Sequence, residues 1–186
     1  LSLIEQDREK GLFSVRTDKL CTRLTQARNM ITQRMWYPGC AGEVTVDGSA
    51  LKEGDFAGIC ALQGCYGFIG LMRKDGQLRL TVRAVEPQTS SVMPLRPEEN
   101  AEKELACIPF GGEKVRLRLE VDFTEMKDTA SFYYIEEDGT RKKLGGDHKL
   151  YFKLDHFCGC RFGLFVYSTQ EAGGSASFSS FTYECH

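Results

Sequence analysis

Two glutamates five positions apart, Glu120 and Glu125, are the side chains in this 186-residue chain best suited to acid–base chemistry. They stand in the string Glu-Val-Asp-Phe-Thr-Glu, and retaining hydrolysis of a glycosidic bond needs two carboxyl groups about 5–5.5 Å apart. On a regular strand the two residues point to opposite faces, so only a bulge would bring them together. Residues 124–128 have the composition of a turn, so we expect Glu125 at a loop tip and Glu120 on a solvated strand face. We therefore assign no catalytic residue.

A second group of residues suits ligand binding rather than catalysis. Sugar rings offer an apolar C–H face and a rim of hydroxyls, so their receptors combine flat aromatic rings with carboxylate, amide and arginine side chains. Trp36, Tyr37 and Phe157 lie at strand or loop ends, where we expect their rings to be exposed. The candidate ligand-binding residues are Arg34, Trp36, Tyr37, Asp155, His156 and Phe157.

The cysteines and acidic residues do not predict a metal centre or a cofactor. Cys158 and Cys160 are too close for a comfortable bridge, and the pair Cys60 and Cys65 lacks the partners of a zinc site. Most of the eight cysteines stand in apolar runs, which favours reduced, buried thiols and a cytoplasmic protein. A structural calcium ion would have Glu43, Asp55 and Asp122 as its candidate ligands, but no ordered ligand loop accompanies them.

The elements that must position these residues are predicted to be strands. Residues 114–123 alternate, with Val115, Leu117, Leu119 and Val121 on one face and charged residues on the other. Residues 161–168 carry apolar side chains on both faces, which predicts a strand in the middle of a sheet, and Gly163 leaves room there for a neighbour. Asp-Gly pairs at 75–76 and 138–139 predict hairpins. Further strands are predicted over 12–16, 31–37, 41–47, 55–63, 66–73, 77–84, 104–110, 129–137, 140–146 and within 171–185.

About a dozen short strands without a convincing helix predict an all-β protein, an antiparallel β-sandwich of jelly-roll type. We expect one domain over 1–186, with 1–11 as a linker or leading segment and the proline-rich residues 86–103 as a surface excursion. Because the chain opens on Leu1, we expect it to be a piece of something longer. The net charge of −2 without a basic cluster argues against nucleic acid, and no apolar run reaches the roughly 20 residues that cross a bilayer.

Five ordered strings resemble the C-terminal concanavalin A-like domain of family 43 β-xylosidases, over about residues 12–183. They are Ile-Thr-Gln-Arg at 31–34, Gly-Asp-Phe-Ala-Gly at 54–58, Gln-Gly before Tyr-Gly within 63–67, Arg-Phe-Gly-Leu-Phe with Tyr and Thr within 161–169, and Glu-Ala-Gly-Gly at 171–174. The resemblance implies a sandwich that follows a catalytic five-bladed propeller, for which this chain is too short. It also implies that one sandwich loop supplies an aromatic to the substrate pocket, and Phe157, with His156 beside it, matches that position.

Taken together, the residues and the resemblance predict a non-catalytic accessory domain of a family 43 glycoside hydrolase. Its expected partners are xylan or xylo-oligosaccharide and the catalytic propeller. Two alternatives stay open: a stand-alone sandwich hydrolase or lyase that uses Glu120 and Glu125, and a plain interaction domain without affinity for sugar.

Overall fold

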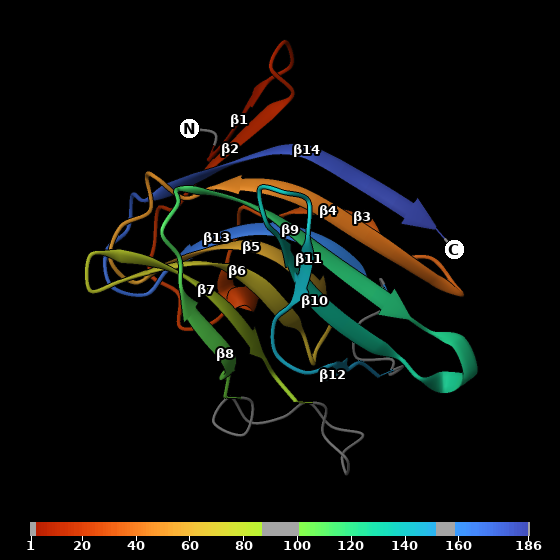
Figure 1. Ribbon diagram of the computed structural model, residues 1–186. Helices are drawn as coiled ribbons and strands as arrows, with labels where there is room; N and C mark the ends of the chain where they lie inside the picture. The colour runs from red at the N-terminus through yellow and green to blue at the C-terminus, as the bar shows by residue number, and fades with distance from the viewer. Residues whose placement is uncertain (1–2, 87–100, 152–158, 186) are drawn as a thin grey trace.

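The computed structural model describes residues 3–86, 101–151 and 159–185, which form two antiparallel sheets packed face to face (Figure 1). Strands of the first sheet are β1 (Ile4–Asp7), β2 (Leu12–Arg16), β4 (Gly39–Asp47), β9 (Lys114–Asp122), β10 (Thr129–Ile135), β11 (Arg141–Lys143), β12 (His148–Lys149) and β14 (Ser175–Cys185). Strands of the second sheet are β3 (Ile31–Arg34), β5 (Asp55–Leu62), β6 (Gly67–Lys74), β7 (Gln77–Ala84), β8 (Lys103–Pro109) and β13 (Arg161–Ser168).

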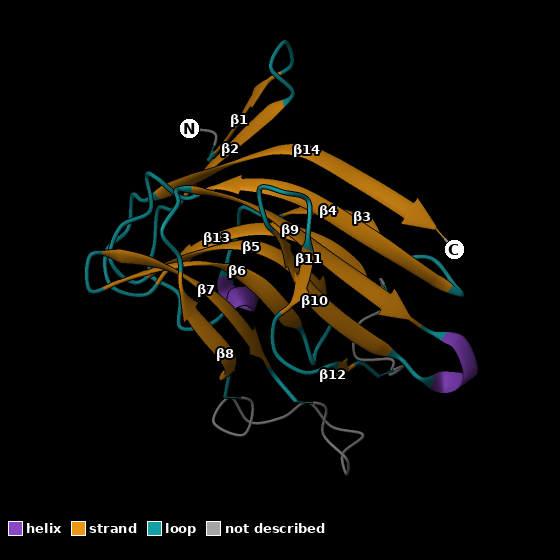
Figure 2. Ribbon diagram, in the orientation of Figure 1, coloured by secondary structure: helices purple, strands orange, loops and turns teal. Residues whose placement is uncertain are grey.

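The order of strands in the first sheet is β1-β2-β14-β4-β9-β10-β11, with β12 beside β10. The order in the second sheet is β3-β13-β5-β6-β7-β8. Two short 3₁₀ helices, η1 (Leu24–Gln26) and η3 (Thr124–Met126), are the helical segments drawn in Figure 2. The predicted β-sandwich is therefore confirmed. In the described residues, no helix has the length and apolar character needed to cross a membrane.

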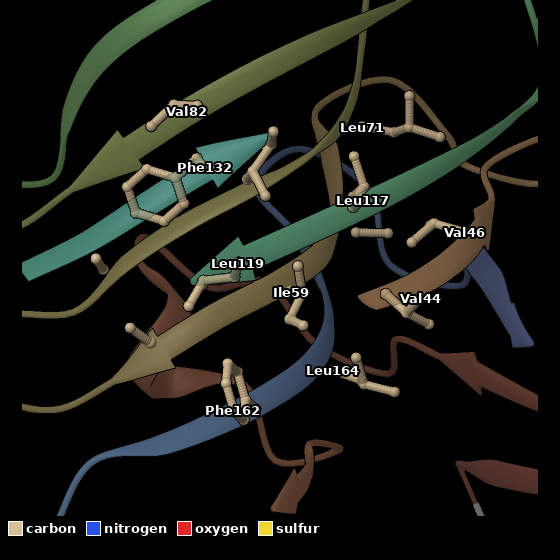
Figure 3. Packing of buried hydrophobic residues seen from close by; sticks show 14 of the residues in the cluster. Val44, Val46, Ile59, Leu71, Val82, Leu117, Leu119, Phe132, Phe162 and Leu164 are labelled. Atoms are coloured by element: carbon tan, nitrogen blue, oxygen red, sulfur yellow. The ribbon is translucent and has the colours of Figure 1, made fainter. Parts of the chain in front are cut away.

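The main core fills the space between the sheets and follows from the alternation along each strand (Figure 3). On β9 the predicted inward residues are buried and the intervening charged residues face outward. Leu117 and Leu119 of β9 point toward Ile59 of β5 and Phe162 of β13 across the sandwich. Residues whose side chains leave water in this way supply most of the stabilising free energy of such a fold.

A second apolar cluster covers the outer face of the second sheet. Phe165 and Tyr167 of β13 pack there with Phe56 and Phe68, while Leu24 of η1 lies over them. Strand β13 is thus buried on both faces, as its composition predicts, and it is flanked by β3 and β5. The missing side chain of Gly163 makes room for two sulfur atoms, because a Cβ there would lie 2.7 Å from those of Cys60 and Met30.

Both predicted hairpins are present, and two other segments differ from the prediction. Residues 1–11 contain strand β1, which pairs with β2, so this segment is part of the first sheet rather than a linker. The strand predicted over 31–37 ends at Arg34, because the chain turns there toward β4. Of the excursion predicted over 86–103, residues 87–100 lie outside the described residues, whereas residue 102 is packed against the second sheet.

Candidate functional site

The candidate site is one end of the sandwich, formed by residues 34–38, 123–127 and 160–161, which we call the loop end. It lies on the right of Figure 1, where η3 follows β9 and where β14 finishes. The Phe123 amide donates a hydrogen bond to the Pro38 carbonyl (2.9 Å), and the Met35 amide donates one to the Cys160 carbonyl (3.2 Å). These bonds hold the β3–β4 connection, the η3 turn and the entry to β13 side by side.

The loop end presents three large apolar side chains to solvent. Trp36 is 54% exposed, Tyr37 75% and Met126 84%. Neither sheet covers the short connections that carry these residues, so their side chains have little to pack on. Exposure of Trp36 and Tyr37 was predicted from their position at a strand end and is confirmed. Single exposed apolar residues are common, but three at one end of a domain suggest a surface that contacts something else.

The other predicted binding residues have different outcomes. Arg34 ends β3 directly opposite Arg161 of β13 and is exposed at the loop end, so the structure brings it together with Trp36 and Tyr37. Asp155, His156 and Phe157 lie outside the described residues.

A groove of about 540 Å³ runs from Pro38 across the outer face of β9 and β10. Its wall carries both apolar and polar groups, and hydrogen bonds hold several of the polar groups in place. The Asp122 carboxylate accepts hydrogen bonds from the Thr124 hydroxyl (2.6 Å) and amide (2.9 Å), and Lys127 lies 3.0 Å away. These hydrogen bonds lower the pKa of Asp122 to about 2, so the carboxylate is charged at neutral pH. The hydroxyl of Ser131 completes a surface that can donate to and accept from a polyol.

The structure does not bring Glu120 and Glu125 together as a catalytic pair. Strand β9 pairs with β4 and β10 without a register shift over Lys114–Asp122, so the bulge that such a pair requires is absent from this strand. Glu125 lies in η3 with a φ of 49°, at the tip of the turn. Glu120 faces outward and forms ion pairs with Arg118 (2.7 Å) and Arg141.

Glu120 belongs to a surface network centred on Arg118. Besides Glu120, the Arg118 guanidinium reaches Glu184 (2.9 Å) and Glu43 (3.6 Å). Burial lowers the pKa of Arg118, but hydrogen bonds to Glu184 and Glu120 outweigh it and raise that pKa above its ordinary value. Glu120 is engaged by two arginines on the outer face of the sheet and has no second carboxylate beside it, so it stabilises that face rather than supporting acid catalysis.

The calcium candidates are spread over three strands and are engaged elsewhere. Asp55, at the start of β5, accepts a hydrogen bond from the Lys52 amide (2.8 Å). Glu43, on β4, pairs with two arginines of β9, and Asp122 ends that strand. In the part of the chain that the structure describes, no three His, Cys, Asp or Glu side chains gather in a way that could hold a metal ion.

The sequence did not single out Glu102, which lies just before β8 and packs its carboxylate against the second sheet. Its side chain is 5% exposed and accepts hydrogen bonds from the hydroxyls of Tyr66 (2.6 Å) and Tyr167 (2.9 Å). Arg83 forms an ion pair with it at 2.9 Å. Burial, followed by the charge of Glu102, raises the pKa of both tyrosines, which keeps the hydroxyls protonated as donors. No local pattern could have shown this role, because its partners are 19, 36 and 65 positions away.

Comparison with known proteins identifies the family. Residues 7–184 match the family described as the beta xylosidase C-terminal concanavalin A-like domain. The chain belongs to this family. It is thus a domain of the kind found at the C-terminal end of family 43 glycoside hydrolases (GH43), as the five strings indicated.

Solved structures agree with this assignment. A bifunctional GH43-CE protein of Bacteroides eggerthii shares 34% identity with a TM-score of 0.86, over 98% of this chain and 22% of that one. A GH43 enzyme engineered for endo-xylanase and exo-arabinofuranosidase activity shares 24% identity with a TM-score of 0.81, over 95% and 35%. A xylan beta-1,4-xylosidase of Bacillus halodurans C-125 shares 15% identity with a TM-score of 0.72, over 93% and 32%.

The GH43 domain described here spans between about a fifth and a third of the length of these three relatives. At the two lower identities the likeness shows the fold alone. A search among curated protein sequences finds no match.

Proposed function

We propose that this domain is the accessory sandwich of a GH43 enzyme of the β-xylosidase or arabinofuranosidase type, and that its loop end binds xylan-like glycan beside the catalytic propeller. The observation that carries the proposal is the exposed pair Trp36 and Tyr37, which directly precedes Pro38 in the wall of the groove. A flat ring can stack on the C–H face of a pyranose, while the groove offers partners for its hydroxyls.

The geometry of the loop end supports a role at a glycan chain rather than at a single sugar. Tyr37 precedes Pro38, which lines the groove, and the groove continues along β9 to Ser131 on β10. An extended ligand could therefore contact a ring at one end and hydroxyl and carboxylate groups beyond it. Arg34, also exposed here, adds a donor that can bridge neighbouring oxygens.

The catalytic partner is proposed from the lengths of the relatives. Most of each relative lies outside the region that matches this chain, and the B. eggerthii protein is described as bifunctional. We propose that the loop end faces a catalytic propeller and that Asp155, His156 and Phe157 belong to the same contact. They follow Tyr151 and precede Gly159 and Cys160, and Cys160 lies at the loop end.

The cellular setting is also part of the proposal. No disulfide joins two cysteines within the described residues, and most of these cysteines are buried. This supports a protein that works in a reducing compartment such as the cytoplasm.

Calorimetric titration of the 186-residue chain with xylohexaose and with soluble arabinoxylan tests the glycan site. We expect saturable binding that is lost in Tyr37→Ala and weakened in Phe157→Ala. Leu105→Ala is the matched control, because Leu105 is an exposed apolar residue on β8, away from the loop end. Equal binding by all three variants would contradict the assignment to the loop end, and no binding at millimolar sugar would remove glycan binding from the proposal.

Docking is tested separately with a GH43 catalytic domain added in trans. Sedimentation velocity should show a complex that Trp36→Ala and Met126→Ala weaken and Leu105→Ala does not. If no complex forms and the glycan still binds, the sandwich is a binding module that needs no contact with the propeller.

A further inference from the structure

Strand β14, the last strand along the chain, contains a bulge that changes which of its side chains face the core. Ser179 lies opposite Thr45 of β4, but Thr182 lies opposite Glu43, so β14 has one residue more than its partner over this interval. Ser180, within the bulge, has a φ of 53°. A bulge of this kind reverses which residues of a strand face the core. Phe178 points inward before the bulge, and odd-numbered residues point inward after it.

The bulge places two cysteines directly opposite each other on neighbouring strands, with their side chains on the same face of the sheet. Cys185 of β14 is the direct cross-strand partner of Cys40 of β4. Directly opposed residues of antiparallel strands have Cα atoms about 4.5–5.5 Å apart, which lies inside the range that a disulfide spans. Cys40 is fully buried, while Cys185 is exposed at the open end of the sandwich.

Tyr183 lies on the same face of the sheet as the pair and packs against the core beside it. Tyr183 lies opposite Gly42, one pair before Cys185 on the same face, and its ring packs edge-on against Phe162 of the other sheet (5.8 Å between centroids). Burial raises the pKa of the Tyr183 hydroxyl, and the neighbouring Cys185 and Cys40 thiols add to that rise. The residue thus closes off the core behind the pair.

We propose that Cys40 and Cys185 form a redox-sensitive pair, which small-molecule disulfides such as oxidised glutathione convert into a cross-strand disulfide. The proposal does not rest on the proposed function. It is argued only from the pairing of β4 with β14 and from the side chains that pack beside the two cysteines. It assigns a modification site to two cysteines. Without it, Cys40 is only a small buried apolar residue and Cys185 only an exposed thiol.

The reaction has two exchange steps. The exposed Cys185 thiol loses its proton to solvent, and its sulfur attacks one sulfur of the glutathione disulfide, which releases one glutathione thiolate. The Cys40 thiol then loses its proton, and its sulfur attacks the Cys185 sulfur of the mixed disulfide, which releases the second glutathione thiolate. Two protein thiols are oxidised and one glutathione disulfide is reduced. Burial raises the pKa of the Cys40 thiol, so Cys185 reacts first.

The pair lies directly behind the exposed aromatic loop. The Trp36 amide donates a hydrogen bond to the Cys40 sulfur (3.4 Å). A disulfide at this point would join the end of β14 covalently to the strand that leads out of the loop. Oxidation would therefore restrain the loop end, which makes the pair a site where redox state acts on this surface.

Mass spectrometry of the intact chain tests the pair directly. The chain is equilibrated in glutathione buffers of increasing oxidised fraction, quenched in acid, alkylated and digested. We expect a peptide in which Cys40 and Cys185 are linked, with loss of two hydrogens from the chain and no retained glutathione. In Cys185→Ser the linked peptide is absent. In Cys107→Ser, which removes the partly exposed thiol of β8, it forms as in the wild type.

Three results would overturn the proposal. One is recovery of Cys185 only as a stable mixed disulfide with glutathione while Cys40 stays alkylated. Another is linkage of Cys185 to a different cysteine or to a second copy of the chain. The third is that neither cysteine reacts at any buffer ratio.

Discussion

Removing the Glu102 carboxylate should destabilise the domain far more than its place beside a proline-rich segment suggests. Alanine at this position leaves the hydroxyls of Tyr66 and Tyr167 without their acceptor, and each tyrosine is 1% exposed. A buried polar group without a partner costs about 1–3 kcal/mol. Arg83 is partly exposed, so solvent compensates for much of its lost ion pair. We expect Glu102→Ala to lower the free energy of unfolding by about 3–5 kcal/mol.

Urea denaturation followed by circular dichroism measures this loss as a shift in the midpoint. Glu104→Ala is the matched control, because Glu104 is exposed on β8, two positions after Glu102, and should change stability by less than about 0.5 kcal/mol. Tyr66→Phe should cost less in the Glu102→Ala background than in the wild type, since the hydroxyl it removes has already lost its acceptor. A Glu102→Ala midpoint equal to that of Glu104→Ala would refute the account of this network.

Three further perturbations test other parts of the fold. Gly174→Ala should reduce the free energy of unfolding by more than about 2 kcal/mol in the same urea assay, because its Cβ would lie 1.6 Å from a carboxylate oxygen of Asp55. Gly111→Ala is the control and should change that free energy by less than about 0.5 kcal/mol, because there is open space around Gly111. Burial lowers the pKa of His148, so below about pH 6.5 the unfolded chain binds a proton that the folded chain does not. The free energy of unfolding should therefore fall as the pH is lowered from 7 to 5.5, and this fall should be smaller in His148→Gln. Glu120→Gln should lower the unfolding midpoint by the equivalent of about 1 kcal/mol at low salt, and by less in high salt, because it removes partly exposed ion pairs with two arginines.

Sequence periodicity predicts this sandwich well where a strand has one face in water. In β9 the alternation of Val and Leu with charged residues predicts both the strand and which of its faces is buried. The Asp75-Gly76 pair predicts a tight hairpin turn, and both residues have a positive φ in the structure. In β13 the apolar residues on both faces predict burial, and the structure shows why: a second cluster covers the outer face.

Periodicity fails where a residue's role depends on partners that are distant in the sequence. Strand β1 has too few apolar residues to be recognised, since it is fixed mainly by pairing with β2. Glu102 has the sequence context of a solvated charge, because its tyrosine partners lie 36 and 65 positions away in the chain. The bulge in β14 has only a faint signal, the uneven spacing of Phe178 and Phe181, and without it the pairing of the two cysteines is invisible.

The candidate site was predictable in part. Trp36 and Tyr37 were identified from their position at the end of a predicted strand and before Pro38, and both are exposed. The groove beside them was not, because its wall is assembled from β9, the η3 turn and β10, whose polar residues look like ordinary surface in the sequence.

The most direct test of the loop end as a glycan site uses the intrinsic fluorescence of the domain. Trp36 is the single tryptophan of the chain, so its emission reports on this surface alone. Titration with xylohexaose should shift or quench the emission along a saturable curve, and Tyr37→Ala should flatten that curve. Emission that stays constant up to millimolar xylohexaose in the wild-type chain would contradict glycan binding at the loop end.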